Sequence, residues 1–317
     1  MLTYRTFHNS DPPAIAALWR SRPGQPGIVQ PVLPDLLEQL VFAKLYFDYG
    51  GLVLAHDDGR LVGFAHAGFG PNASEDWIST ETGVVCVVMT DPNCAEAEVA
   101  DGLLDRCEDY LRRRGVKILF AGGLRPLCPF YLGLYGGSEL PGVLDSDTVV
   151  RQALAARGYQ EAERTLLFRR GLDGFESQVD RQQMQVRRQM QVEVTADAPT
   201  HTWWEACTLG EFDLTRFDLV ARGGGPAVAT ALFRSMEPSV TTGVGRGVGL
   251  IHLSVDAVSQ RRGIATFLLN EAFRQFLRQG IMHVEAQASE ANVAAIGILR
   301  KLGLQETGRG GVWRKER

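Results

Sequence analysis

The spacing of apolar residues changes from strand-like to helix-like within one stretch of the C-terminal half. The run from Val248 to Val255 is apolar and rich in β-branched residues, which is typical of a buried strand. After it, apolar residues recur at the spacing of one helix face: Ile264, Leu268, Ala272 and Phe276. We therefore expect a strand, a tight turn and then the N-terminus of a helix.

The chain also contains an internal repeat, which emerges when the sequence is aligned with itself. Three pairs of segments match in the same order, at offsets of 166, 165 and 145 residues: 51–67 with 217–233, 86–122 with 251–287, and 158–161 with 303–306. The polar and charged segment 172–188 belongs to neither repeat. We therefore predict two copies of one domain, residues 1–171 and 189–317, joined by a helical linker at 172–188.

Both copies have the same predicted order of elements. A strand and a helical region come first, followed by a strand, its hairpin partner and a third strand, a long helix, another strand, a short helix and a pair of strands. The hairpins are built around Asp57-Asp58-Gly59 and Gly223-Gly224-Gly225. This order favours an α/β (α+β) fold, in which each copy forms a mixed, mostly antiparallel twisted sheet flanked by helices.

The predicted turn has the chemistry of an anion site. Gly263 lets the main chain approach an anion, the first N–H groups of the following helix are unpaired, and Arg261 and Arg262 add positive charge. Neither the Gly-Lys-Ser/Thr of a phosphate-binding loop nor the three-glycine dinucleotide fingerprint is present at this turn. The turn therefore predicts a pyrophosphate site of another kind.

Two motifs in this half resemble those of the GCN5-related N-acetyltransferases, the GNAT superfamily. Gln260-Arg261-Arg262-Gly263-Ile264-Ala265 resembles the coenzyme A signature Arg/Gln-x-x-Gly-x-Gly/Ala of that family. Asn292, with Ala295 three residues on, a short helix and the closing Gly303-Leu304, resembles the second family motif. The tandem layout with one degenerate copy is also similar to that of the mycothiol synthases.

The resemblance implies an N-acetyltransferase that moves an acetyl group from acetyl-CoA to an amine of a small molecule or peptide, without a metal. It implies that backbone groups of the strand before the turn run beside the pantetheine arm and that Asn292 lies near this arm. The expected cofactor-binding residues are Leu253, Ser254, Val255, Gln260, Arg261, Arg262, Gly263, Ile264, Ala265, Thr266 and Asn292.

The first copy has lost the features of this turn. Opposite Gln260 to Ala265 it carries Ala95-Glu96-Ala97-Glu98-Val99-Ala100, so that carboxylates replace Arg261 and Gly263. Negative charge opposes a phosphate, and a side chain at the glycine position blocks the approach of the backbone. We therefore expect catalysis in the second copy, with the first copy as a degenerate partner.

The first copy also carries an insert of about 20 residues between Gly122 and Asp147, because the offset between the copies falls from 165 to 145 there. A long aromatic loop of this kind is either functional or packed against a neighbour. One hypothesis is that it reaches the cleft of the second copy, where Tyr131, Tyr135 and Glu139 would contact the substrate. The alternative is that it only seals the domain interface.

Two residues are candidates for the base that accepts the proton of the amine. Polar residues alternate with apolar ones on two predicted strands, and His252 and Glu285 are the members whose pKa values proteins tune towards neutrality. A purely structural role is the alternative for both. The usual general acid of the family is a tyrosine, but its position holds Leu299, and all seven tyrosines lie between Tyr4 and Tyr159.

Composition adds limits to this picture. A net charge of −4 gives no reason to expect nucleic acid or a membrane surface, and five cysteines without metal spacing suit a reducing compartment. We expect a cytoplasmic protein, for which a homodimer is one option. Two alternatives remain open for the function: a non-catalytic acyl-CoA sensor or scaffold, and an acyltransferase that uses a longer acyl-CoA.

Overall fold

One mixed sheet of 13 strands runs through both copies. The computed structural model describes residues 1–317 except 23, 177–180, 237–244 and 317. The strands follow the order β1-β2-β3-β4-β5-β13-β7-β12-β11-β10-β9-β8, with β6 paired to β13. Only two of the pairs along this order are parallel, β4 with β5 and β11 with β12. The predicted α/β fold with a mixed, mostly antiparallel sheet is confirmed.

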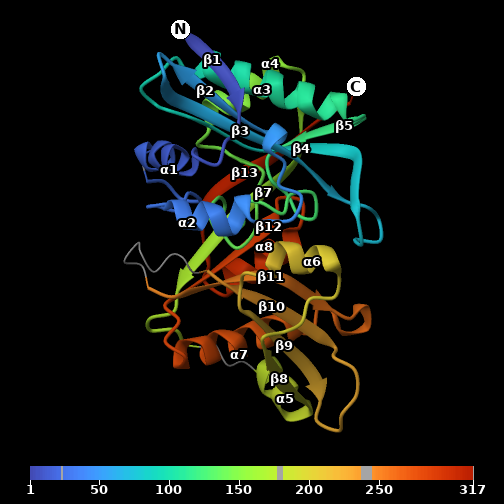
Figure 1. Cartoon of the computed structure of the whole chain (residues 1–317). Helices are drawn as coiled ribbons and strands as arrows, with labels where there is room; N and C mark the ends of the chain where they lie inside the picture. Colours follow the sequence, from blue (N-terminus) through green and yellow to red (C-terminus); the bar gives the residue numbers. More distant parts are fainter. Residues whose placement is uncertain (23, 177–180, 237–244, 317) are drawn as a thin grey trace.

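The first copy forms the upper half of the molecule in Figure 1. Its strands are β1 (Leu2–Thr6), β2 (Leu52–Asp57), β3 (Arg60–Pro71), β4 (Ile78–Thr90), β5 (Ile118–Ala121), β6 (Val143–Leu144) and β7 (Gln160–Gly171). Its helices are α1 (Pro12–Ser21), α2 (Pro34–Leu37), α3 (Glu96–Arg113) and α4 (Thr148–Ala156), with short helical turns at η1 (Glu38–Phe42) and η2 (Tyr49–Gly51).

The second copy forms the lower half. It is preceded by the helix α5 (Arg181–Gln189), which lies in the predicted linker except for its last residue. The other helices are α6 (Trp203–Leu209), η4 (Ala257–Ser259), α7 (Ile264–Arg278) and α8 (Val293–Lys301). The strands are β8 (Met190–Ala196), β9 (Leu214–Ala221), β10 (Ala229–Ser235), β11 (Gly247–Val255), β12 (His283–Ser289) and β13 (Gln305–Glu316).

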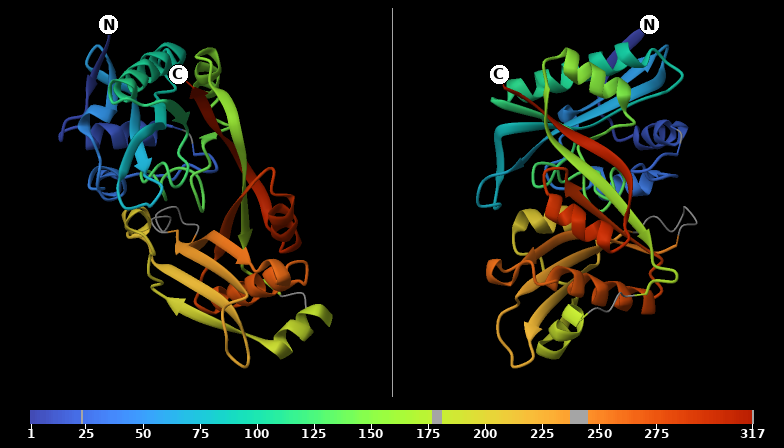
Figure 2. Two further views of the ribbon diagram at one scale, coloured as in Figure 1. Left: turned by 90° about the vertical axis from the view of Figure 1, so that its right-hand side faces the viewer. Right: turned by 180° about the vertical axis from the view of Figure 1, so that it is seen from behind.

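The last strand of each copy completes the sheet of the other copy. Residues Thr165–Gly171 of β7 pair with β12, whereas Trp313–Glu316 of β13 pair with β5. β7 and β13 also pair with each other in antiparallel fashion, and both views in Figure 2 show them side by side between the two halves. The sequence predicted a pair of strands at the end of each copy. In the structure this pair consists of one long strand from each copy.

The exchanged strands also carry apolar side chains into the core of the opposite copy. Leu166 and Phe168 of β7 are buried with α7 in the core of the second copy. Trp313 of β13 packs with Val150 and Leu154 of α4 in the first copy. Since apolar burial is the main driving force of folding, each copy depends on a strand of the other for its stability.

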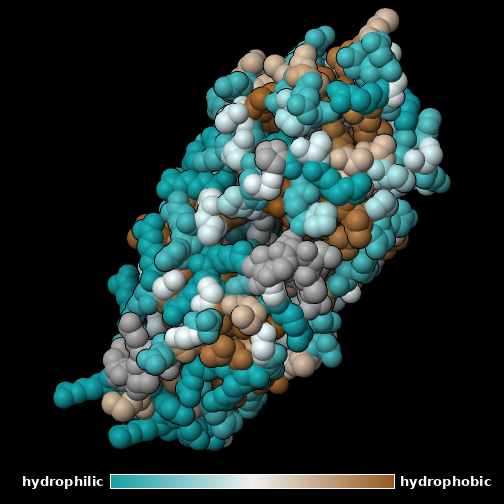
Figure 3. Space-filling view, turned by 90° about the vertical axis from the view of Figure 1, so that its left-hand side faces the viewer, coloured by the Kyte–Doolittle hydropathy of each residue, from teal (hydrophilic) through white to brown (hydrophobic). Residues whose placement is uncertain are grey.

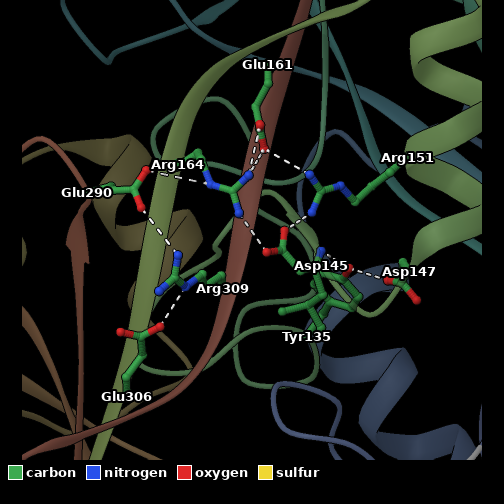
Figure 4. Close-up of polar contacts among 10 residues, drawn as sticks. Tyr135, Asp145, Asp147, Arg151, Glu161, Arg164, Glu290, Glu306 and Arg309 are labelled. Carbon is green, nitrogen blue, oxygen red and sulfur yellow. Dashed lines mark hydrogen bonds and ion pairs between the residues drawn. The ribbon is translucent and has the colours of Figure 1, made fainter.

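A network of charged side chains runs along the same two strands (Figure 4). Arg164 of β7 contacts Asp145 at 2.7 Å and Glu290 at 3.8 Å, and Arg309 of β13 contacts Glu290 at 3.5 Å. Glu290 directly follows β12. Its backbone N–H also donates to the Arg164 carbonyl at 2.8 Å. The network therefore fixes the turn between β12 and α8 to the exchanged strands.

Two features are absent from the parts of the chain that the structure describes, a membrane-spanning helix and a metal-binding cluster. None of the helices there is long and apolar enough to cross a bilayer, and no group of three or more His, Cys, Asp or Glu residues could hold a metal ion. The five cysteines are free thiols. The face of the molecule that carries α1 and α2 is mostly hydrophilic, with apolar surface in patches (Figure 3).

Candidate functional site

The two central strands of the second copy separate halfway along their length. β11 pairs with β12 from Gly247 to Leu250 only, opposite His283 to Ala286. At the same point a β-bulge leaves Ile251 without a partner on β10, because Leu232 pairs with His252 and Phe233 with Leu250. Residues Ile251–Val255 therefore have one free edge. The space between the separated ends of β11 and β12 is called the gap here. Some backbone N–H and C=O groups of Ile251–Val255 face this gap and can pair with an extended ligand.

The turn that leads from this strand into α7 has the backbone that the sequence predicted. Gly263 precedes α7 with a φ of 72°, a conformation that favours glycine. The first N–H groups of α7 have no partner within the helix, and Arg261 and Arg262 are exposed without an ion-pair partner among the described residues. Gln260 donates from its side-chain amide to the Val255 carbonyl at 3.2 Å, which closes the turn. The turn thus presents an open, positively charged N-terminus.

The linker helix α5 lies against this turn. Gln183 donates to the Gly263 carbonyl at 3.4 Å, and a Cβ atom at Gly263 would lie 3.0 Å from the side chain of Gln182. A larger residue at position 263 would therefore strain the backbone and press on α5. Sequence reasoning missed this contact, because the linker belongs to neither repeat.

The second motif begins α8 on the other side of the gap. Asn292 is exposed and caps the helix, with its side-chain oxygen accepting from the Ala295 N–H at 3.0 Å. Leu299, at the position of the usual tyrosine, is 3% exposed and packs in the core of the second copy. Its side chain is therefore unavailable to the gap, whatever its chemistry.

The first copy has the same backbone geometry at the matching place. β4 and β5 pair only from Thr82 to Val85, and a bulge leaves Cys86 unpaired on β3, 165 residues before Ile251. This gap, however, is occupied by the insert. Tyr135, Gly142 and Val143 line what remains of it, a cavity of about 10 Å³, which is no larger than one water molecule needs. The first copy therefore has no room there for a pantetheine arm.

The insert tyrosines belong to the core of the first copy, contrary to the hypothesis that they contact a substrate. Tyr131 is 2% exposed and stacks on Trp19 at a ring distance of 6.2 Å. The Tyr135 hydroxyl donates to Asp147 at 2.6 Å and accepts from the Leu144 N–H at 2.9 Å. Burial raises the pKa of both hydroxyls well above the usual range. Aromatic surface of this size gains more from burial in the empty gap than from exposure.

The insert does touch the second copy, through Gly137, Ser138 and Glu139. Arg234 of β10, which is 0% exposed, donates to the Ser138 carbonyl at 2.8 Å and to the Gly137 carbonyl at 2.7 Å. Burial lowers the pKa of Arg234 to about 10. Gln287 of β12 donates to the Glu139 carbonyl at 2.6 Å, whereas the Glu139 carboxylate pairs with Arg125. The backbone of Glu139 thus lies beside the gap, whereas its carboxylate is already paired with Arg125.

The two candidate bases lie on the face of the sheet opposite α7. His252 is exposed just after the bulge and forms no hydrogen bond with any described residue. Glu285 is half-buried on β12 and lies 3.9 Å from the Arg169 guanidinium, a weak ion pair. Burial raises the pKa of Glu285, which Arg169 and Arg234 partly offset. Of the two, Glu285 has the environment of a group tuned towards neutral pH.

His283 is a polar residue of this face that the sequence analysis did not select. It precedes Glu285 by two residues on β12 and is 4% exposed. Burial lowers its pKa to about 4, so the imidazole is neutral at physiological pH. The alternation of His283, Glu285 and Gln287 along the strand was the available signal, but it does not show how deeply each side chain is buried.

Comparisons with known proteins agree with this geometry. Two regions of the chain, residues 17–134 and 182–304, match the model of the acetyltransferase (GNAT) family. A tandem GNAT protein from the clavulanic acid biosynthesis pathway is similar in structure over 100% of this chain and 98% of its own, with a TM-score of 0.68 and 14% identity.

Two further solved structures are similar over nearly the whole chain. A GCN5-related N-acetyltransferase from Sphaerobacter thermophilus aligns with 99% of this chain and 95% of its own, at a TM-score of 0.64 and 16% identity. A GCN5-related glucosamine N-acetyltransferase region of a fungal multi-domain β-N-acetylglucosaminidase covers 99% of this chain, with 38% of its own aligned, at a TM-score of 0.72 and 15% identity. No curated protein matches the sequence. The two family matches together span most of the chain, which belongs to the GNAT acetyltransferase family as a tandem of two GNAT regions.

Proposed function

We propose that the second copy, residues 189–317, transfers an acetyl group from acetyl-CoA to the amine of a small molecule, and that the first copy, residues 1–171, supports it without turnover. One observation carries this proposal. Both copies keep the strand separation and the bulge, but only the separation next to Ile251 is open and leads to an αL glycine at the start of a helix.

The residues of the second copy fit the parts of acetyl-CoA. The unpaired N–H groups at the start of α7, with Arg261 and Arg262, suit the pyrophosphate, and Gly263 lets it approach the backbone. The free edge of Leu253, Ser254 and Val255 suits the amide groups of pantetheine. Asn292 and the buried start of α7 from Ile264 to Thr266 complete the walls of this site.

The reaction requires little of the protein beyond position and proton transfer. The nitrogen lone pair of a neutral amine attacks the thioester carbonyl carbon, and the C–S bond breaks with its electron pair on sulfur. Backbone N–H groups at the bulge are suited to stabilise the carbonyl oxygen as it gains negative charge. Glu285 is our candidate for the proton acceptor, directly or through water, with His252 as the exposed alternative. We assign protonation of the thiolate to solvent, because Tyr131 and Tyr135 are buried in the first copy.

A non-catalytic acyl-CoA-binding protein is the second candidate. The observation in its favour is Leu299, whose side chain is buried where the family usually has its general acid. Such a protein would bind acetyl-CoA at the same turn but would release no free thiol in the presence of amines. A longer acyl group on the donor remains compatible with the proposal and is distinguished by competition among acyl-CoAs.

The test is a thiol-release assay with acetyl-CoA and a panel of small amines, applied to two reciprocal variants. Arg261→Glu with Gly263→Glu gives the second copy the carboxylates that the first copy has at the matching positions, and we expect kcat/KM to fall at least about 100-fold, because charge-assisted contacts to the pyrophosphate are lost. Glu96→Arg with Glu98→Gly makes the opposite change in the first copy. We expect this second variant to keep the wild-type activity, because the gap of the first copy is filled.

Equal activity of both variants and the wild type would reject the site at Arg261–Gly263. Binding of acetyl-CoA without thiol release for any amine would favour the non-catalytic candidate instead.

A further inference from the structure

A cavity of about 320 Å³ lies between the two copies, on the face of the sheet that carries Glu285. One wall is the loop Gln25–Gln30 of the first copy, and the insert contributes Gly133, Gly136 and Gly137. The floor consists of the side chains Arg169, His283 and Glu285 from the adjacent strands β7 and β12. Cavities of this size are typical of small-molecule sites.

Two buried polar atoms at this cavity lack a partner among the described residues. They are Nδ1 of His283 and Nε2 of Gln25. His283 is held in place by its neighbour, since a Cβ at Gly247 would collide with the imidazole ring. Buried polar groups are normally hydrogen-bonded. Both atoms have almost no accessible surface, so a ligand in the cavity would bond to them only after the lining side chains move.

The charges of the floor are also incompletely matched. Glu285 and Arg169 are directly opposite each other on β12 and β7, but the closest distance between their charged atoms is 3.9 Å, too long for a hydrogen bond. The nearby Arg234 already donates to the Gly137, Ser138 and Ser235 carbonyls. A ligand that carries an ammonium and a carboxylate a few ångströms apart would therefore satisfy Glu285 and Arg169 separately.

The other residues that line the cavity indicate the chemistry of the ligand's side chain. Pro26, Ile28, Val29 and Met236 give the cavity an apolar side next to the charged floor. Gly137 leaves room above the carboxylate, because a Cβ there would lie 2.9 Å from Glu285 Oε2. An apolar side chain on the zwitterion would face the apolar side.

The cavity is also close to the expected position of the thioester. Glu285 pairs with Gly249, two residues before the bulge at Ile251. Neighbouring strands are about 4.8 Å apart, so a group bound to the Glu285 carboxylate is within one or two residue spacings of the bulge.

We infer that this cavity binds the acceptor, and that the acceptor is a small α-amino acid with an apolar side chain, its amino group at Glu285 and its carboxylate at Arg169. This inference rests on the proposed function. Glu285 takes one proton from the ammonium group, and the resulting neutral amine attacks the thioester. As the C–S bond breaks with its electron pair on sulfur, the nitrogen loses its second proton to water. The products are the N-acetylated amino acid and free coenzyme A, whose thiolate takes a proton from water.

The test compares ligands that differ in one charged group. L-leucine and L-methionine are the zwitterions, L-leucinamide lacks the carboxylate, and D-glucosamine represents an amine acceptor without one. We measure binding by calorimetry without acetyl-CoA, and acetyl transfer by thiol release. We expect at least one of the two zwitterions to bind and to be acetylated, with kcat/KM at least 10-fold above that of L-leucinamide and of D-glucosamine.

Two arginine variants locate the carboxylate. Arg169→Gln should remove the 10-fold preference for the zwitterion over L-leucinamide. Arg314→Gln is the matched control, since Arg314 also lies on a strand, is similarly exposed and pairs with a glutamate, Glu316. It should keep the preference.

The outcomes separate this inference from the proposed function. Thiol release with D-glucosamine or L-leucinamide that equals or exceeds release with the zwitterions would overturn the acceptor assignment and leave the transferase proposal standing. Failure of both zwitterions to bind, or an unchanged preference in Arg169→Gln, would also overturn it. Binding of a zwitterion that depends on Arg169, in a protein that does not bind acetyl-CoA, would refute the transferase proposal and keep the cavity as an amino-acid site without acetyl transfer.

Discussion

The two strand separations of this protein share a backbone and differ in almost every side chain that chemistry would need. In both copies the parallel pairing stops after four residues, next to a bulge at Cys86 or Ile251. Where the second copy has His252 and Glu285, however, the matching residues of the first copy are Val87 and Phe120.

The contents of the two gaps differ as well. The first copy fills its gap with Tyr135 and ties that residue to Asp147, the counterpart of Asn292. In the second copy Asn292 is exposed. The comparison shows that the bulge and strand separation belong to the fold, whereas the open gap, the αL glycine and the polar face are what distinguish a candidate site from a structural copy.

The largest expected effect is on the free energy of unfolding, and it tests whether the first copy depends on the last strand of the second. Trp313→Ala removes a buried indole that lies on the last strand of the second copy but packs in the core of the first. We expect a loss of about 3–5 kcal/mol in the free energy of unfolding. In hydrogen exchange, protection should fall in α3 and α4 of the first copy. Loss confined to α7 and α8 would contradict the exchange of strands.

The next largest effect is a loss of stability at acidic pH. His66, buried in the first copy, has its pKa lowered to about 3 by burial, far below the value of about 6.5 in an unfolded chain. The unfolded chain binds the proton first, so stability is fully present above pH 6.5 and falls as the pH drops from there towards 3. The expected slope is about 1.4 kcal/mol per pH unit. Urea unfolding between pH 7 and pH 4 measures it.

His66→Phe is the matched variant for this slope. The replacement keeps a ring among Phe47, Phe130 and Tyr131 but removes the titrating group. It should lower the acid sensitivity and leave the smaller part that comes from His283, whose pKa is lowered to about 4. An unchanged slope would show that His66 does not titrate between the two states.

A smaller effect addresses the insert. Tyr135→Phe leaves the buried Asp147 carboxylate and the Leu144 N–H short of one partner each, which costs about 1–3 kcal/mol. The KM values for acetyl-CoA and amines should stay the same, because the hydroxyl lies in the first copy. A rise in KM for the amine without a change in stability would indicate that Tyr135 contacts the acceptor after all.

The smallest effect is expected from the charged network. Glu290→Gln weakens two long, partly exposed ion pairs with Arg164 and Arg309. Such pairs contribute about 0–1 kcal/mol, so the urea midpoint should barely move and the residual shift should shrink at high salt. A large loss of stability would mean that the turn before α8 depends on this charge more than on its backbone contacts.

Much of the fold could be predicted from the sequence, because it depends on local periodicity. The repeat, the hairpins and α7 follow from the spacing of residues such as Leu268 and Ala272, and the turn at Gly263 from its glycine and arginines. The exchange of β7 and β13 could not be predicted, since each long strand has a pattern that would suit either sheet. Nothing local to Phe168 or Trp313 tells which core will bury it.

The site was predictable only in part for a similar reason. Alternation along a single strand could place a residue on one face of that strand, as it did for His252 on β11 and for Glu285 on β12. Contacts across the chain could not: the filling of the first gap by Tyr135, the contact of Gln182 with Gly263, and the cavity at His283 all depend on segments far apart in the sequence.

Calorimetric titration of acetyl-CoA into the wild-type protein tests the asymmetry of the two copies most directly. We expect one site per chain, which is lost in the variant that carries Arg261→Glu and Gly263→Glu and retained in the one that carries Glu96→Arg and Glu98→Gly. Two sites per chain, or one site that survives the change at Arg261 and Gly263, would contradict the proposed asymmetry.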